Sequence, residues 1–394
     1  MSLDEKKVKR LIGIMNEMTS VEIPPMKPII RCFELGMDED ILEYLLRVGT
    51  SRHSKETLHQ LFDTMLAMGE ISNARDWPQF WNELMVMSFL IPSEHSDEYE
   101  LASIFPGWIE LATSGAPTKK RQDIMESFME FWEILKTLNV GPLRFMTNMQ
   151  GVRDRDRGVM HMGTPTAVTP ARGKRTIEVG ERLTSEQEVL PVNSVFDIFA
   201  AHKDQIAVMN CICRSHKQLN GGGTCEHGMP LQSCMPVGAI AQQLIDSGVA
   251  RHVPYDEAIE MVKDFERKGC IHTTFHYAGD ARREALAVCN CCTECCLLYG
   301  GLRQGYTSKV QMRAYNRPEV VDASACRGCN QCGKHCPTEA IRYDKEAGKL
   351  VFNYENCVGC GQCVTQCAFG VQRMVPDERA VFVKTKKKSA CAHA

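Results

Sequence analysis

Two cysteine-rich runs near the end of the chain decide how that region folds. The first reads Cys326-Arg-Gly-Cys329-Asn-Gln-Cys332-Gly-Lys-His-Cys336-Pro337, and the second reads Cys357-Val-Gly-Cys360-Gly-Gln-Cys363-Val-Thr-Gln-Cys367. Each has the spacing C-x2-C-x2-C-x3-C, in which three closely spaced thiolates can curl around one face of an iron–sulfur cube. The fourth thiolate has already turned away, so it ligates the cube of the other run.

This spacing predicts two [4Fe-4S] clusters that exchange their fourth ligands. We assign one cluster to Cys326, Cys329, Cys332 and Cys367. We assign the other to Cys357, Cys360, Cys363 and Cys336. Thiolates also bind zinc in sets of four, but eight cysteines at this doubled spacing favour iron–sulfur cubes.

At these residues the chain resembles the bacterial two-cluster ferredoxins, over roughly residues 317–377. Pro337 after Cys336 fits the pattern of that family, whereas Ala368 replaces the corresponding proline after Cys367. The flanks predict strands at 319–321, 341–343 and 349–352, a turn at 344–348 and one helical turn at 338–341. The segment 368–371 repeats this pattern, which indicates an internal duplication.

Length and cysteine placement divide the 394 residues into several domains. Of the twenty cysteines, only Cys32 lies before residue 211, and the other nineteen lie between Cys211 and Cys391. We predict an α+β protein with a mainly helical N-terminal domain, a central mixed cysteine-rich domain and a C-terminal ferredoxin-like two-cluster domain. The predicted boundaries are 1–150 for the helical domain, 151–182 for an extended arm, 183–315 for the cysteine-rich domain, 316–380 for the ferredoxin domain and 381–394 for a basic tail.

The cysteine count also indicates the compartment. A formal net charge of −3 identifies no partner, and no run of about 18 apolar residues predicts a membrane span. The N-terminus shows no secretory or twin-arginine signal, so we expect a cytoplasmic protein. In that reducing compartment, twenty cysteines indicate metal centres rather than disulfides.

Residues 1–150 show apolar side chains at helical spacing, with Ser54 and Asp76 at expected N-caps. Residues 98–105 alternate as a strand does. Helices followed by an extended piece resemble a winged-helix domain, which would suggest DNA binding. The region holds 15 Lys plus Arg against 23 Asp plus Glu, a net of −8. Because a DNA reader needs a basic face, we expect a protein-docking module and no nucleic-acid partner.

A second cysteine field lies between residues 211 and 296. We expect strands at 206–209 and 271–275 and helices at 237–247 and 258–269 to surround it. We assign a third cluster to Cys211, Cys213, Cys225 and Cys234. A fourth would take four of Cys289, Cys291, Cys292, Cys295 and Cys296. Crossed ligation between the two segments, a non-cubane cluster and a structural zinc ion with His227 as a ligand remain open alternatives.

Other residues in this field have simpler interpretations. We expect Arg214 to compensate cluster charge and Cys270 to be a buried thiol, with Cys32 and Cys391 outside the ligand sets. The stretch 206–300, with its C-x-C-R and C-N-C-C runs before a two-cluster ferredoxin domain, resembles multi-cluster ferredoxin-like proteins of anaerobic bacteria. That resemblance implies electron transfer, usually as a subunit beside a catalytic partner.

The sequence shows no P-loop, dinucleotide fingerprint or hydrolytic triad. We therefore expect an electron-transfer protein or subunit, rather than a self-contained enzyme. It would relay single electrons through three to four [4Fe-4S] clusters to or from a partner oxidoreductase. The alternatives are an iron–sulfur redox sensor that regulates transcription, and an enzyme with a substrate-binding cluster in 211–296. The basic run Lys384 to Lys388 is either a steering patch for an acidic partner or a solubilising tail.

Overall fold

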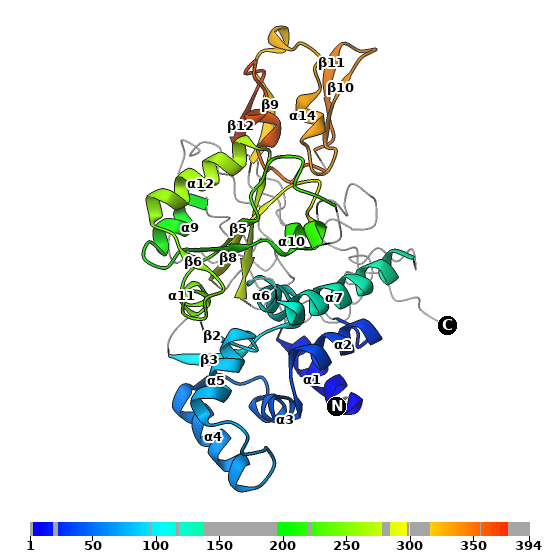
Figure 1. Ribbon diagram of the computed structural model, residues 1–394. Helices are drawn as coiled ribbons and strands as arrows, with labels where there is room; N and C mark the ends of the chain where they lie inside the picture. Colours follow the sequence, from blue (N-terminus) through cyan, green and yellow to red (C-terminus); the bar gives the residue numbers. More distant parts are fainter. Residues whose placement is uncertain are drawn as a thin grey trace, which may run out of the picture.

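A computed structural model describes residues 3–18, 23–93, 97–115, 118–137, 195–219, 222–277, 284–297, 299, 316–354 and 356–376. Figure 1 shows three parts arranged in chain order along the molecule: N-terminal helices, a central sheet with its helices, and a small C-terminal part of short strands and helical turns. The expected arm at 151–182, the basic tail at 381–394 and Cys391 lie outside the described residues. No helix in the described ranges is long and apolar enough to cross a bilayer.

The N-terminal part is mainly helical, as the periodicity predicts. Asp38, Ser54 and Asp76 cap α3, α4 and α5 by accepting backbone N–H groups, and Gln79 completes a capping box with Asp76. The expected N-caps at Ser54 and Asp76 are thus confirmed. The elements are α1 (Glu5–Glu17), α2 (Lys27–Gly36), α3 (Glu39–Val48), α4 (Lys55–Ala67), α5 (Trp77–Val86), the π-helix η1 (Ile104–Trp108), α6 (Ile109–Thr113) and α7 (Lys119–Thr137).

A small antiparallel sheet completes this part. Strands β1 (His53–Ser54), β2 (Leu90–Pro92) and β3 (Glu98–Leu101) lie in the order β1-β3-β2. The predicted strand at 98–105 ends at Leu101 because the chain turns into η1. There Trp108 is fully buried between Phe33 and Phe89, with ring centroids 4.5 and 5.1 Å away.

The central part is a five-stranded antiparallel sheet. Its strands are β4 (Ala207–Asn210), β5 (Gln232–Pro236), β6 (Arg251–His252), β7 (Ile271–His276) and β8 (Ala285–Cys291), in the order β6-β4-β5-β8-β7. Its helices are α9 (Val195–Ala201), α10 (Ile212–Leu219), α11 (Ala239–Asp246) and α12 (Tyr255–Arg267). The predicted strands and the two predicted helices of this part are confirmed, with small changes at their ends.

The two faces of this sheet have different neighbours. Val288 and Met235 share a core with Phe199 of α9 and Val262 of α12. The opposite face belongs to the core of the helical part. There α11 contacts β2, and Gln243 Nε2 donates to the carbonyl of Leu90 at 3.1 Å. One face of the sheet is therefore covered locally, and the other joins it to the N-terminal helices.

The C-terminal part repeats one small unit. Strand β9 (Asn316–Val320) pairs with β12 (Gln372–Pro376), and β10 (Ile341–Asp344) pairs with β11 (Lys349–Phe352), as the expected hairpin does. Helical turns α14 (Gln331–Lys334) and α15 (Gln362–Thr365) occupy equivalent places in the two halves, and a 3-10 turn η3 (Ala323–Ala325) precedes the first.

The helical turn expected at 338–341 is wrong. The chain makes a tight turn after Pro337 instead, and Glu339 takes a left-handed φ of 53°. This conformation directs the backbone N–H of Ala340 to the Sγ of Cys336, at 3.1 Å. The N–H therefore donates to the thiol and not to a carbonyl group of a helical turn.

Candidate metal centres

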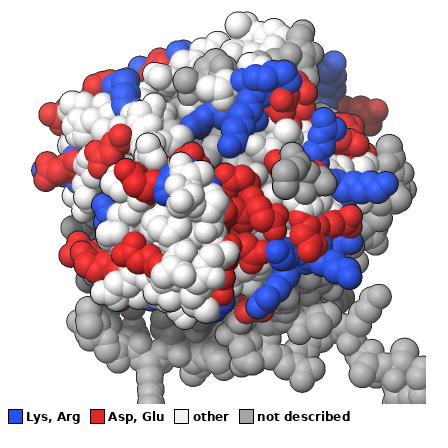
Figure 2. Space-filling model, turned by 60° about the horizontal axis from the view of Figure 1, so that its bottom comes forward, with Lys and Arg blue, Asp and Glu red and all other residues white. Residues whose placement is uncertain are grey.

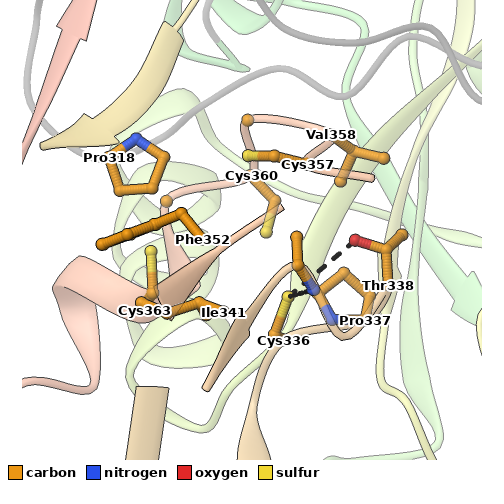
Figure 3. A pocket seen from close by; sticks show the side chains of 13 residues that line it. Pro318, Cys336, Pro337, Thr338, Ile341, Phe352, Cys357, Val358, Cys360 and Cys363 are labelled. Carbon is orange, nitrogen blue, oxygen red and sulfur yellow. Dashed lines mark hydrogen bonds between the residues drawn. The ribbon is translucent and has the colours of Figure 1, made fainter. Parts of the chain in front are cut away.

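The first candidate centre is a cavity in the C-terminal part. Its walls include Cys336, Cys357, Cys360 and Cys363, with the apolar side chains of Ile341, Phe352, Pro318 and Val358 around them. The unfilled space amounts to about 360 Å³, part of it open to solvent. Figure 3 shows the four thiols arranged around this space. Because three of the four cysteines are buried, we call it the shielded cavity.

The second candidate centre is a cavity with about 310 Å³ of unfilled space, part of it open to solvent. It is lined by Cys326, Cys329, Cys332 and Cys367, together with Leu350, Phe369 and Val371. Only Cys332 of these four is buried, and Cys329 is exposed, so we call it the exposed cavity. In both cavities the fourth cysteine comes from the other run of the sequence.

Backbone geometry explains how each loop wraps its cavity. Gly328 and Gly359, at equivalent positions of the repeat, have φ of 67° and 76°, which glycine adopts without strain. A Cβ at Gly328 would lie 2.8 Å from the ring of Tyr343. Asn330 and Gly361 also correspond, both left-handed, at the starts of α14 and α15. Asparagine is the side chain that tolerates this conformation best, so the two loops follow the same path.

Burial affects the protonation of these thiols. It raises the pKa of Cys360 and Cys363 in the shielded cavity, and the neighbouring cysteine charges raise it further. Burial also raises the pKa of Cys332 in the exposed cavity. Thiolate ligands must be deprotonated, so a bound cation is what would make this arrangement favourable. The donor sets, the cavities and their apolar walls thus fit iron–sulfur cubes.

In the central part, strand register decides which thiols share a face. Cys289 of β8 is paired with Cys234 of β5 on one side and with Thr273 of β7 on the other, so these side chains point to one face. Cys291 lies on the same face, and the Sγ atoms of Cys289 and Cys291 are 3.1 Å apart. Asn290, between them, points to the opposite face.

A six-thiol set gathers on the face that meets the N-terminal helices. The Cys213 thiol is close enough to those of Cys211 and Cys296 for them to shift its pKa, and the pKa of Cys296 in turn responds to Cys213 and Cys291. Cys234 is close enough to Cys289 and Cys211 for their charges to raise its pKa, after the larger effect of burial. The set comprises Cys211, Cys213, Cys234, Cys289, Cys291 and Cys296.

A three-thiol set lies apart from it. Cys225 and Cys292 have Sγ atoms 3.7 Å apart, and the backbone N–H of Cys295 donates to Cys292 Sγ at 3.2 Å. The donor atoms of Cys225, Cys292, Cys295 and Glu294 all lie within 4.8 Å of one another. Cys225 and Cys292 belong to the core under α9 and α12.

This arrangement differs from the grouping expected from spacing along the chain. Cys225 lies with Cys292 and Cys295, rather than with Cys211 and Cys234. Cys289, Cys291 and Cys296 join the earlier segment. The physical reason is the β5–β8 pairing, which brings the two segments together and sends alternate residues to opposite faces. Of the groupings that the sequence leaves open, crossed grouping of the two segments describes this geometry.

Arg214 lies between the two sets. Its side chain is 2% exposed and donates to the carbonyl of Asn290 at 2.9 Å, to Cys270 Sγ at 3.7 Å and to Ser233 Oγ. Burial lowers the pKa of Arg214, but the charges of Cys211, Cys270, Cys292 and Cys225 outweigh it and raise the pKa. This placement agrees with the expected role of compensating thiolate charge. Cys270 is fully buried, as expected.

Two buried titratable residues of this region were not identified from the sequence: Glu110 beside the six-thiol set and His272 on the opposite face of the sheet. Glu110 of α6 accepts the backbone N–H of Gly107 at 2.8 Å, and burial raises its pKa to about 8. Its charge is close enough to act on Cys234. His272, paired across the strands with Asn290, is buried with its pKa lowered to about 4. Glu110 lies about 100 residues before the first of these cysteines, so only the packing of α6 against the central part reveals it.

The ferredoxin-like part is attached directly to this thiol-rich region. Gln362 Nε2, at the start of α15, donates to the carbonyl of Cys270 at 2.5 Å. Thr365 and Gln366 bond Glu266, and Gln366 also bonds the carbonyl of Arg267. At Gly269, with φ of 91°, a Cβ would lie 2.7 Å from His335 Nδ1. His227 is outside the three-thiol set, and its ring centroid is 5.7 Å from that of His335.

Comparison with known families agrees with this site. Residues 325–371 match the family described as the 4Fe-4S dicluster domain. These residues therefore form a domain of the type that holds two [4Fe-4S] clusters. The expected resemblance to two-cluster ferredoxins is thus confirmed for this part of the chain. A search of solved structures found none that matches the chain.

Curated relatives are similar to a part of this chain. The formate dehydrogenase-O iron-sulfur subunit of Escherichia coli K12 is 31% identical over 65 residues, which cover 16% of this chain and 22% of that protein. A selenate reductase subunit of Mesobacillus selenatarsenatis is 31% identical over 91 residues, covering 21% and 31%. The aliphatic sulfonate oxidoreductase, polyferredoxin-like subunit of Pyrococcus furiosus is 36% identical over 52 residues, covering 13% and 30%. The matches span less than a third of each relative.

Proposed function

We propose that this protein is an electron-relay subunit that connects a redox partner to a thiol-rich centre in its own central domain. The observation that carries the proposal is the packing of the ferredoxin domain on the central domain, where Gln362 donates to the carbonyl of Cys270 and the Cys270 thiol in turn accepts from Arg214 beside the thiol sets. Bound [4Fe-4S] clusters would accept and donate single electrons. The chain contributes their spacing, burial and compensating charges.

The ligand sets follow from the positions of the thiols. We propose Cys326, Cys329, Cys332 and Cys367 for the cluster of the exposed cavity, and Cys336, Cys357, Cys360 and Cys363 for that of the shielded cavity. Four members of the six-thiol set would hold a third cluster. We also propose the domains expected from the sequence, with ends at 150, 182, 315 and 380, positions that lie outside the described residues.

The exposed cavity is the proposed contact point for a partner. Cys329 is exposed there, and Phe369 in the wall of the same cavity is 47% exposed. Val321, whose backbone N–H donates to the carbonyl of Val371 in that wall, is 49% exposed. A cluster near the surface, surrounded by apolar contacts, allows close approach of a second redox centre. Relatives that are named as subunits of reductases and dehydrogenases support a partner oxidoreductase for this chain.

The N-terminal domain is proposed as a docking module. The element order α3, β1, α4, α5, β2, β3 and the sheet order β1-β3-β2 support the winged-helix-like description. Figure 2 shows the molecule with the bottom of Figure 1 turned forward. Acidic and basic side chains are interspersed on this face, and several acidic side chains touch one another near the middle of the view. Such a face is unsuited to phosphate backbones. A sequence-specific shift of DNA by the iron-loaded protein would contradict this proposal and favour a regulator.

The relay is tested by iron and sulfide analysis of protein produced without oxygen, followed by EPR spectroscopy during stepwise reduction. Three clusters predict about twelve irons and about twelve sulfides per chain. They also predict magnetic interaction between the signals of the two ferredoxin-type clusters. About eight irons per chain, with no EPR signal beyond those of the two ferredoxin-type clusters, would mean that the central domain holds no cluster and takes no part in the relay.

A further inference from the structure

The three-thiol set has the dimensions of a site for a single metal ion. Its donors are Cys225 from the loop before β5 and Cys292, Glu294 and Cys295 from the turn after β8. All four donor atoms lie within 4.8 Å of one another, and Cys225 and Cys292 Sγ are 3.7 Å apart. Two sulfurs bonded to one tetrahedral zinc ion at about 2.3 Å must lie about 3.8 Å apart. The observed separation fits one ion at the centre of the set.

The ferredoxin cavities provide an internal comparison. Ligands of a cube bind four separate irons at its corners, so their sulfurs stand further apart than ligands of one ion. The cysteines of those cavities surround unfilled spaces of about 360 and 310 Å³. Among the described residues, the tight grouping of three or more donors occurs at Cys225, Cys292, Glu294 and Cys295 and not in the ferredoxin cavities.

The local chemistry also suits a mononuclear site. Cys292 and Cys295 have the C-x2-C spacing of zinc-binding turns, and the N–H of Cys295 donates to Cys292 Sγ. Backbone N–H groups of His227 and Met229 hydrogen-bond the Cys225 thiol. Donors of this kind hold metal ligands in place in characterised sites.

The fourth donor is held by its own contacts. Glu294 forms an ion pair with Lys217, and the N–H of Glu226 donates to Glu294 Oε2 at 3.3 Å. Lys217 also donates to the carbonyl of Thr224 at 3.1 Å. Three thiolates and one carboxylate carry four negative charges, so a divalent cation leaves two. Lys217 and the buried Arg214, whose charge acts on Cys225 and Cys292, compensate these two.

We propose that Cys225, Cys292, Cys295 and Glu294 bind one tetrahedral divalent ion, with zinc as the preferred metal. Thiolate-rich tetrahedral sites favour zinc among the common divalent metals. The ion fastens the loop at 222–231 to the end of β8. The six-thiol set alone remains for iron and sulfide in the central domain. This inference concerns a separate site and does not depend on the direction or partner of the electron relay.

The test is the zinc and iron content of protein produced without oxygen in medium containing both metals. We expect one zinc per chain in addition to the iron. Cys225→Ser and Cys295→Ser should lose the zinc and keep the iron. Cys326→Ser should lose about four irons and keep the zinc. Cys32→Ala, which removes a buried thiol outside all the proposed ligand sets, should change neither.

X-ray absorption at the zinc edge of the unaltered protein gives a measurement that does not depend on folding of the variants. The expected shell is three sulfurs at about 2.3 Å and one oxygen. Lys217→Met should weaken zinc affinity about 10-fold, measured by competition with a chelator, because it releases Glu294. The proposal is overturned by absence of zinc, by loss of about four irons in Cys225→Ser, or by loss of the zinc in Cys326→Ser.

Discussion

The ferredoxin domain and the central domain both gather cysteines, but they do so by different means. In the ferredoxin domain, each loop brings three thiols to one cavity within seven residues of chain, and the repeat supplies the fourth. In the central domain, residues far apart in sequence meet because β5 pairs with β8. Spacing along the chain therefore predicts neighbours in the first case. In the second case, strand register and face decide them.

The two regions also differ in what holds them together. Four of the six buried residues in the ferredoxin core are cysteines: Cys332, Cys336, Cys357 and Cys363. The core of the central sheet is mainly aliphatic and aromatic. We infer that the ferredoxin domain depends on its clusters for stability, while the rest of the chain depends on apolar burial.

The largest expected effect follows from this difference. Anaerobic removal of iron by a chelator should unfold residues 316–376, because little apolar core remains there, and leave the N-terminal helices folded. Hydrogen exchange measured by mass spectrometry should show protection in α14 and α15 falling to nearly that of an unfolded peptide. Protection in α2 serves as the control. Unchanged protection in the ferredoxin domain would contradict the inference.

Trp108→Ala tests the other region, because it removes part of the apolar core of the helical domain and leaves the cysteines unchanged. Trp108 is fully buried between Phe33 and Phe89, so its loss leaves a cavity and should cost about 3–5 kcal/mol in the free energy of unfolding. Circular dichroism during denaturant unfolding measures this change. The iron content should stay the same, and a loss of iron would mean that the two regions are not independent.

A smaller effect is expected from Arg214→Met, at the boundary between the two thiol sets. The variant removes the hydrogen bonds to Asn290 and Ser233 and a buried positive charge, at a cost of about 3 kcal/mol in stability. It should also make reduction of the central iron–sulfur centre less favourable, which a potentiometric EPR titration measures. Arg214→Lys keeps the charge and should shift the potential less. Equal shifts of the reduction potential in both variants would mean that the charge of Arg214 does not set that potential.

The contact between the regions has a predicted pH dependence. Burial raises the pKa of Glu266 from its usual 4.5 to about 7, although Thr365 donates to it. A raised folded pKa means that the folded state binds more protons between pH 4.5 and 7. Glu266 therefore makes stability fall as pH rises through that window.

Glu266→Gln should remove this pH dependence and raise stability at pH 8 by about 2 kcal/mol. Gln keeps the carbonyl acceptor for Thr365, which isolates the effect of charge. Denaturant unfolding at pH 5 and pH 8 measures the difference. The same loss of stability between the two pH values in both proteins would exclude Glu266 as its cause.

The smallest expected effect is that of Gln362→Ala. It deletes the hydrogen bond to the carbonyl of Cys270, worth about 1 kcal/mol, without altering a proposed ligand. Exchange of backbone amides near residues 269–271 should increase while iron content stays constant. Thr365→Ala, at the edge of the same contact, is the matched control and should change exchange less. If amide exchange near residues 269–271 changes in neither variant, the main contact between the ferredoxin domain and the central domain lies elsewhere.

The sequence by itself determined the ferredoxin domain, the hairpin at 341–352 and the N-caps at Ser54 and Asp76. Each depends on residues close together in the chain, whose short connections permit few geometries. It also predicted metal-binding roles for nine of the ten cysteines between residues 211 and 296, with Cys270 set aside as a buried thiol. It could not divide those cysteines correctly in space, because Cys225 and Cys292 are 67 residues apart and meet only across the sheet.

Tertiary structure alone decided three features of the metal region. The β5–β8 register placed Cys234, Cys289 and Cys291 on one face of the sheet, and the packing of α6 brought Glu110 towards Cys234. The fit of α15 against Cys270 attached the ferredoxin domain to the central one. These features depend on which surfaces pack together, and short-range spacing contains no information about that choice.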